Sequence, residues 1–320
     1  MGKKTLVAAL AIACGLTACV GDSNQTNSID NNPINPATLV QNGEISQSQL
    51  INATVPMIST TIGDQSFVCS GTLLDSQTVL TAAHCVLDME KKNSGVLFTN
   101  KNVISAANIS VMLPKNLSIP VGVASKDGIN TYAVEQVFVH PEAFLGAGVD
   151  GGSLDIIDTY HLNDLAILHL KKPVARQYNF AYLATENPKP NTPEIIVGYG
   201  VNNGDGVVYA SKNDDGGSGI LRYATSYVSK ITDGSDGRYI DVGGKVYYND
   251  SHSEYSVYTK ICQGDSGGPD FVLNNKRLVV TGVHSFGSGE GCGEATTPSS
   301  SVSVAAYYDW INGGYLDYHL

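Results

Sequence analysis

The segment Cys262–Pro269, with the sequence CQGDSGGP, constrains the fold of this chain more than any other stretch. Glycine adopts backbone angles and permits close approaches that other residues do not, so its glycines indicate a tight turn. Ser266 lies inside that turn, between an aspartate and a glycine. A hydroxyl exposed on a tight turn among small neighbours suits a nucleophile that attacks a carbonyl group. Ser266 is therefore a candidate nucleophile.

Two upstream segments offer the partners that a serine nucleophile needs. Residues 81–85 read TAAHC and contain His84, and residues 163–168 read NDLAIL and contain Asp164. A histidine can accept the serine proton, and a carboxylate can hold that histidine in the required tautomer. The chain order His, Asp, Ser differs from the order in subtilisins and in α/β-hydrolases.

Together these motifs resemble the trypsin and chymotrypsin family of serine endopeptidases. The resemblance implies an all-β fold with two six-stranded antiparallel β-barrels and a short C-terminal helix. It also implies hydrolysis of peptide bonds through an acyl-enzyme, with His84, Asp164 and Ser266 as the triad. The backbone N–H groups of Gly264 and Ser266 would form the oxyanion hole. No metal or organic cofactor is implied.

Length and composition agree with a globular enzyme. The chain has 320 residues, of which 42% are hydrophobic and 15% charged, and its many glycines and tyrosines favour short strands joined by turns. The formal net charge of −11 argues against nucleic acid as a partner, because phosphate contacts need a basic surface. We expect a monomer that acts on protein or peptide substrates.

The N-terminus reads as an export signal, with two lysines before an apolar run over residues 6–13. Residues 16–19 read LTAC and resemble the bacterial lipobox, so residues 1–18 would be removed and Cys19 lipidated. The alternative is ordinary signal cleavage with an incidental Cys19. Val20 resembles the residue that follows the cysteine in lipoproteins sorted to an outer membrane. The lipid would be the only link to the membrane, and the domain would face the periplasm or the cell surface.

The remaining chain divides into a tether and one protease domain. Residues 19–44 are rich in Asn, Asp, Ser and Pro and are interpreted as a flexible tether. The domain would span residues 45–320, with barrels over about 45–185 and 190–320. Strands are expected over residues 132–140, 164–170, 194–200 and 277–286, with a helix over residues 305–312. The glycine-rich residues 146–152 are interpreted as a surface loop, although a lid over the site is an alternative.

Four cysteines remain beyond the signal and the lipobox, and counting alone allows three pairings. The family resemblance selects Cys69–Cys85 and Cys262–Cys292, and export makes both disulfides chemically reasonable. A metal site is disfavoured, because no Cys-x-x-Cys or His-x-x-x-His spacing occurs.

The pocket for the residue before the cleaved bond departs from trypsin. Lys260 stands six positions before Ser266, where trypsin-like members carry an aspartate, so a Lys or Arg substrate would be repelled. The segment that resembles the family's substrate-pairing Ser-Trp-Gly is preceded by His284 and consists of Ser285, Phe286 and Gly287. Glutamate-specific relatives carry histidine at the position of His284, and Ser299 aligns with another pocket-wall residue. We hypothesise a preference for Glu or Asp. The alternative is an apolar preference, with Lys260 turned to solvent or paired with Glu290.

Asp265 raises the question of activation. In the family this carboxylate pairs with an α-amino group released by proteolysis, but the usual Arg-Ile-Val-Gly-Gly site is missing. The family register places the new terminus near Ile45, after Glu44, and residues 20–90 contain no Lys or Arg. Either cleavage follows Glu44 and also frees the domain from its anchor, or Asp265 has another partner.

Two other function classes compete with an endopeptidase. One is a binding or adhesion lipoprotein on a protease scaffold, and the other is an esterase with the same triad. An intact triad and Gly264 argue against the binding protein, because binding requires none of them.

Overall fold

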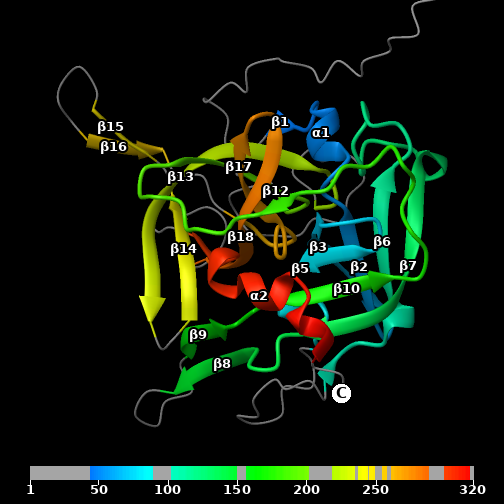
Figure 1. Ribbon diagram of the computed structural model, residues 1–320, viewed down its shortest axis with the longest axis horizontal. Coiled ribbons are helices and arrows are strands. Elements are labelled where there is room, and N and C mark those ends of the chain that lie inside the picture. Colours follow the sequence, from blue (N-terminus) through cyan, green and yellow to red (C-terminus); the bar gives the residue numbers. More distant parts are fainter. Residues whose placement is uncertain are drawn as a thin grey trace, which may run out of the picture. The chain divides into compact units, whose positions relative to one another are not determined.

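A computed structural model of the chain describes residues 44–88, 102–149, 156–201, 218–234, 237–243, 245–248, 254–257, 261–287 and 299–317. Strands dominate these residues (Figure 1). The expected signal and the lipobox cysteine lie outside them, as do Lys260, Glu290 and Cys292. Among the described segments, no helix has the length and apolar character needed to cross a bilayer.

The first barrel is a curled antiparallel sheet in the order β3-β2-β6-β7-β10-β5-β4. Only Gly71 separates β3 from β4, so the two ends of the sheet are halves of one bent segment, and six chain segments surround the core. The bounds are β2 Met57–Ile62, β3 Gln65–Ser70, β4 Thr72–Leu73, β5 Thr78–Thr81, β6 Ile109–Pro114, β7 Ile129–Val139 and β10 Ala166–Leu170.

The second barrel closes fully. Its strands follow the order β13-β12-β17-β18-β19-β14, and β14 pairs back with β13. The bounds are β12 Pro193–Gly198, β13 Arg222–Gly234, β14 Gly237–Gly243, β17 Pro269–Asn274, β18 Arg277–Gly287 and β19 Ser299–Ser303. Two short strands add to it: β1 (Glu44–Ile45) pairs with β13, and β11 (Tyr182–Leu183) runs parallel to β18. The predicted two-barrel, all-β fold is therefore confirmed.

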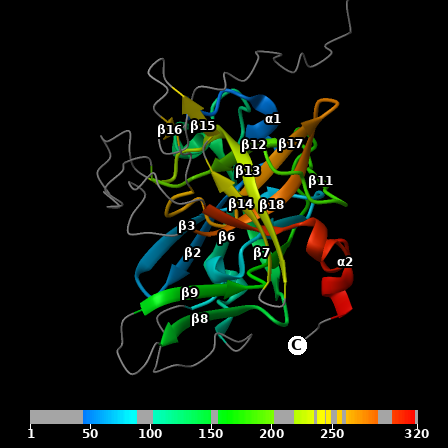
Figure 2. The same ribbon diagram turned by 90° about the vertical axis from the view of Figure 1, so that its left-hand side faces the viewer.

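Smaller elements complete the fold. Strands β8 (Phe144–Val149) and β9 (Ile156–Leu162) pair as a hairpin, which Figure 2 shows side by side. The expected surface loop over residues 146–152 therefore begins as strand. Strands β15 (Lys245–Tyr248) and β16 (Glu254–Val257) form another hairpin. Helix α1 spans Gln49–Asn52, and the predicted C-terminal helix is a 3-10 turn, Ala305–Tyr307, followed by α2 (Tyr308–Ile311).

One hydrophobic core runs through both barrels. Strand β10 contributes Ile167 and Leu168 from the first barrel, and Phe271 and Val283 come from β17 and β18 of the second. All four side chains are fully buried, which explains why β10 reads as an almost continuous apolar run rather than an alternating one. The polar segments found by sequence lie at the ends of these core strands, and the strands therefore fix their positions.

Candidate active site

His84 is held at the end of the buried strand β5. A 3-10 turn, Ala83–Cys85, follows the strand and carries the histidine. The Thr60 hydroxyl donates to the carbonyl oxygen of Cys85 at 3.0 Å. A disulfide joins Cys85 to Cys69 on β3 and confirms the first predicted pairing. The turn is thus attached both to its own strand and to its neighbour.

Asp164 lies just before β10 and is fully buried. Its Oδ1 accepts the backbone N–H of His84 at 2.9 Å, and its Oδ2 lies 2.7 Å from Nδ1 of the same residue. The Ser285 hydroxyl also donates to Oδ2 at 2.6 Å. Burial lowers the pKa of His84, but the adjacent carboxylate raises it by more, so the net pKa lies above its usual value. The carboxylate orients the ring and stabilises its protonated form.

Ser266 lies in a turn that packs against the histidine segment. Gly264 has φ of 98°, a left-handed conformation that glycine adopts without strain. The backbone N–H of Ser70 donates to the carbonyl oxygen of Ser266 at 2.8 Å, and Sγ of Cys85 lies 3.5 Å from the same oxygen. The three motifs, far apart in sequence, therefore meet at the junction of the two barrels.

The peptide groups of the turn are held by their carbonyl oxygens. The carbonyl oxygen of Gln263 accepts from the N–H of Val201 at 3.0 Å, and that of Asp265 accepts from the N–H of Gly268 at 2.8 Å. In a trans peptide the N–H points opposite to the carbonyl, so these contacts fix the directions of the N–H groups of Gly264 and Ser266.

Ser70 is a site residue that the sequence analysis missed. It is fully buried on β3, and its hydroxyl donates to the carbonyl oxygen of Gly264 at 2.9 Å. The Ser70 hydroxyl oxygen in turn accepts the N–H of Tyr199 at 3.0 Å. Ser70 therefore links the first barrel to the nucleophile turn of the second. The only sequence feature that points to Ser70 is its position directly after Cys69, one of the two cysteines in the disulfide.

Asp265 is buried with a complete set of backbone donors. Its Oδ1 accepts the N–H of Gly200 at 2.7 Å, and its Oδ2 accepts the N–H of Cys262 at 2.8 Å. Burial raises its pKa, while the Cys262 N–H, His284, the Gly200 N–H and Arg222 oppose that rise. A Cβ atom at Gly200 would lie 2.6 Å from the carboxylate, so this approach requires glycine.

The structure places the predicted activation residues on the second barrel. Ile45 lies in β1 opposite Arg222, and Glu44 is exposed and opposite Tyr223. The Asp265 carboxylate therefore accepts two backbone hydrogen bonds in the chain that is uncleaved after Glu44. Cleavage after Glu44 stays a prediction.

The predicted pocket residues separate into two groups. Phe286 packs edge to face against Tyr239 on β14, with ring centroids 5.4 Å apart, and Gly287 pairs with Ser299 across β18 and β19. The Ser299 hydroxyl accepts the N–H of Ile261 at 3.1 Å. His284, by contrast, is 1% exposed and points into the barrel. Phe286, Gly287 and Ser299 thus lie together on β18 and β19, whereas His284 is buried against Asp265 and Asp270.

The predicted pairing of Cys262 with Cys292 stays a prediction, because Cys292 lies outside the described residues. Cys262 itself is buried at the start of the nucleophile turn.

Comparisons with known proteins agree with this fold. The chain is 28% identical over 260 residues to chymotrypsin-like elastase family member 1 of Homo sapiens, covering 78% of this chain and 82% of that protein. It is 25% identical over 250 residues to trypsin epsilon of Drosophila erecta, covering 77% of each. For urokinase-type plasminogen activator of Gallus gallus, the identity is 26% over 263 residues, covering 78% of this chain and about half (51%) of that protein. The family model named Trypsin matches residues 45–94 and 88–311, and the chain therefore belongs to the Trypsin family.

Proposed function

We propose that this protein is a serine endopeptidase that uses His84, Asp164 and Ser266. The carrying observation is the 2.7 Å contact between Asp164 and Nδ1 of His84, beside a nucleophile turn whose Ser266 carbonyl oxygen accepts the N–H of Ser70 on β3. Nδ1 donates to the carboxylate, which leaves Nε2 to take the proton of Ser266 as its oxygen attacks a peptide carbonyl. The imidazolium then protonates the leaving amine, and water hydrolyses the acyl-enzyme by the reverse sequence.

The oxyanion of each tetrahedral intermediate would be bound by the N–H groups of Gly264 and Ser266. One such donor contributes about 3 to 4 kcal/mol of transition-state stabilisation, because it is oriented before charge develops. In this protein the orientation comes from the contacts at the Gln263 and Asp265 carbonyl oxygens.

Replacement of the nucleophile tests this function. Ser266→Ala is expected to lower kcat on a protein substrate by about 10⁶-fold and to abolish labelling by a serine-directed phosphonate. Ser229→Ala, at an exposed serine of β13, is the matched control and should behave as the wild type. Turnover that survives Ser266→Ala refutes the proposal. Absence of turnover in the wild type favours the binding-protein alternative.

For specificity we propose a preference for Glu or Asp before the cleaved bond, supported by the sequence position of Lys260, whose charge would repel a basic substrate residue. The test compares kcat/KM on peptides that differ only in Glu, Gln, Phe or Lys at that residue. Equal rates for Glu and Gln would refute an acidic preference, and a maximum at Phe would establish the apolar alternative.

For maturation we propose lipidation at Cys19 and release by cleavage after Glu44. The lipobox-like sequence supports the first step, and the exposure of Glu44 on the short strand β1 supports the second. Outer-membrane attachment through the lipid would follow. N-terminal sequencing and mass spectrometry of the mature protein test both steps. A blocked, acyl-modified Cys19 is expected before release, and Ile45 is expected as the first residue afterwards.

A further inference from the structure

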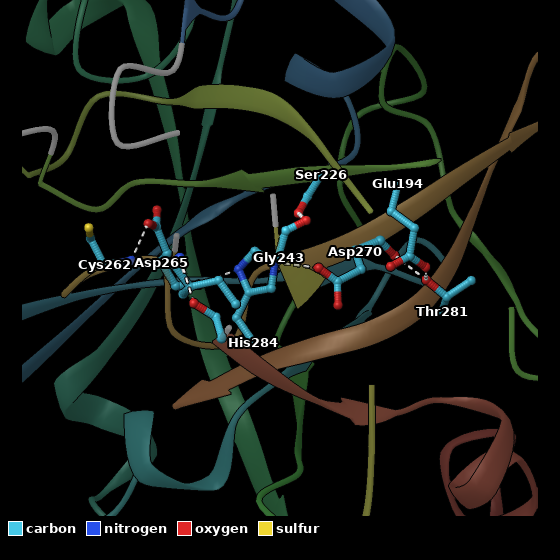
Figure 3. Close-up of polar contacts among 10 residues, drawn as sticks. Glu194, Ser226, Gly243, Cys262, Asp265, Asp270, Thr281 and His284 are labelled. Atoms are coloured by element: carbon cyan, nitrogen blue, oxygen red, sulfur yellow. Dashed lines mark hydrogen bonds and ion pairs between the residues drawn. The ribbon is translucent and has the colours of Figure 1, made fainter. Parts of the chain in front are cut away.

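A line of buried titratable side chains lies behind the nucleophile turn, and the proposed reaction uses none of them. Figure 3 shows His284 on β18, Asp270 on β17 and Glu194 on β12 in a row. Each of the three is at most 1% exposed. Ionised groups are costly in such a place unless they are paired. The hydrogen-bond partners of these three side chains therefore indicate the role of the cluster.

Glu194 is held as the neutral acid. The Thr281 hydroxyl lies 2.5 Å from Oε1 of Glu194 and 3.1 Å from the carbonyl oxygen of Asp270. A hydroxyl has one proton, and a carbonyl oxygen only accepts, so both contacts are hydrogen bonds only when Glu194 supplies the second proton. Burial and the charge of Asp270 raise the pKa of Glu194 well above its usual value, in agreement with this assignment.

The two ring nitrogens of His284 are both engaged. Nδ1 lies 3.1 Å from the carbonyl oxygen of Asp265, so it must carry a proton. Nε2 lies 3.0 Å from Oδ1 of Asp270, which can take the second ring proton as a charge-assisted hydrogen bond. The charged groups around the ring are the carboxylates of Asp265 and Asp270, with Arg222 near the former. A protonated His284 balances buried negative charge in the nucleophile turn and on β17.

The carbonyl oxygen that His284 contacts belongs to the peptide between Asp265 and Ser266. The N–H of that peptide is one of the two proposed oxyanion donors. Backbone bonds from Gly267 to His284 and from His284 to Gly268, both 2.8 Å, already pair β18 with the turn. The side-chain bond to the Asp265 carbonyl oxygen adds a second donor, beside the N–H of Gly268, to the peptide that carries the Ser266 N–H.

We propose that His284 is a positioning residue that orients the Ser266 N–H of the oxyanion hole by donating to the Asp265 carbonyl oxygen, and that Asp270 holds its ring in place. This role rests on the proposed function. It differs from recognition of a substrate carboxylate, because both ring nitrogens face protein acceptors and the ring is buried.

Two substitutions of His284 remove the same charge and distinguish the roles of its two ring nitrogens. The amide nitrogen of His284→Asn takes the place of Nδ1, whereas that of His284→Gln takes the place of Nε2. His284→Gln is expected to lower kcat about ten- to hundredfold with little change in KM. This effect is smaller than the roughly 10²- to 10³-fold loss of kcat expected when an oxyanion donor is removed altogether. His284→Asn should stay within about threefold of the wild type, since it keeps the bond to Asp265. Urea unfolding of both variants measures any shared loss of stability.

The outcomes separate the positioning role from the proposed function. Equal kcat in the Asn and Gln variants, with Ser266-dependent turnover intact in the wild type, overturns the role alone. No Ser266-dependent turnover in the wild type overturns both. Nitrogen-15 NMR of the His284 ring in the wild-type protein tests the role without any variant. A protonated Nδ1 from pH 6 to 8 supports the role, and an unprotonated Nδ1 overturns it.

Discussion

Asp164→Asn probes the geometry of the site most directly, because the amide has nearly the shape of the carboxylate but one acceptor oxygen instead of two. The carboxylate accepts three hydrogen bonds, two from His84 and one from Ser285. An asparagine can place its NH₂ group on either side. Each orientation removes something that the proposed mechanism needs.

With NH₂ at the Oδ2 position, the amide donates to Nδ1 of His84 and forces the ring proton onto Nε2, where it cannot accept the Ser266 proton. With NH₂ at the Oδ1 position, two buried donors face each other at 2.9 Å. Unsatisfied buried groups cost about 1–3 kcal/mol each, so the productive tautomer is disfavoured by roughly 2–6 kcal/mol. Loss of the charge that stabilises the imidazolium adds to this. We expect kcat to fall by about 10⁴, as in the reference triad of this family.

The assay is the rate of Ser266 phosphonylation, which requires no knowledge of the natural substrate. Circular dichroism and urea unfolding establish that the variant is folded. Ser285→Ala is the comparator, because it removes one donor to Asp164 and leaves the tautomer unchanged, at a cost of about tenfold. An Asp164→Asn protein within tenfold of the wild type would refute the assigned roles of Asp164 and His84.

Three further predictions concern pH and the nucleophile turn. The phosphonylation rate should fall as pH decreases through the raised pKa of His84, because only the neutral ring is a base; a midpoint below 6.5 would contradict this. Burial lowers the pKa of His140 to about 4, so below pH 6.5 the unfolded state binds the proton first, and His140 alone should lower the stability at pH 5 by about 2 kcal/mol relative to pH 7. Urea titrations should show this loss reduced in His140→Gln and retained in His169→Gln, whose histidine is partly exposed. Ser70→Ala leaves two buried backbone groups without their partner and should lower kcat at least tenfold, as single-turnover kinetics would show.

The sequence by itself was enough to find the parts of the site that are local. A nucleophile turn needs glycines, and a disulfide beside the histidine needs cysteines; such requirements leave short motifs such as CQGDSGGP and TAAHC. The apolar strands over residues 164–170, 194–200 and 277–286 were likewise evident, and they match β10, β12 and β18. The chain order of three such motifs then indicated the two-barrel fold.

The tertiary structure alone decided which way the side chains of those strands point. A strand presents alternate faces, and a shift of one residue exchanges them. The pairing of β18 with β19 shifts register between His284 and Phe286, and that of β17 with β18 shifts just after Asp270. At these irregularities His284 points into the barrel, toward Asp270 and Glu194. Neither acidic residue belongs to a motif that the sequence analysis recognised. The sequence predicted a specificity residue at His284, and the structure buries that side chain against Asp265 and Asp270, because strand register determines which groups a buried side chain meets.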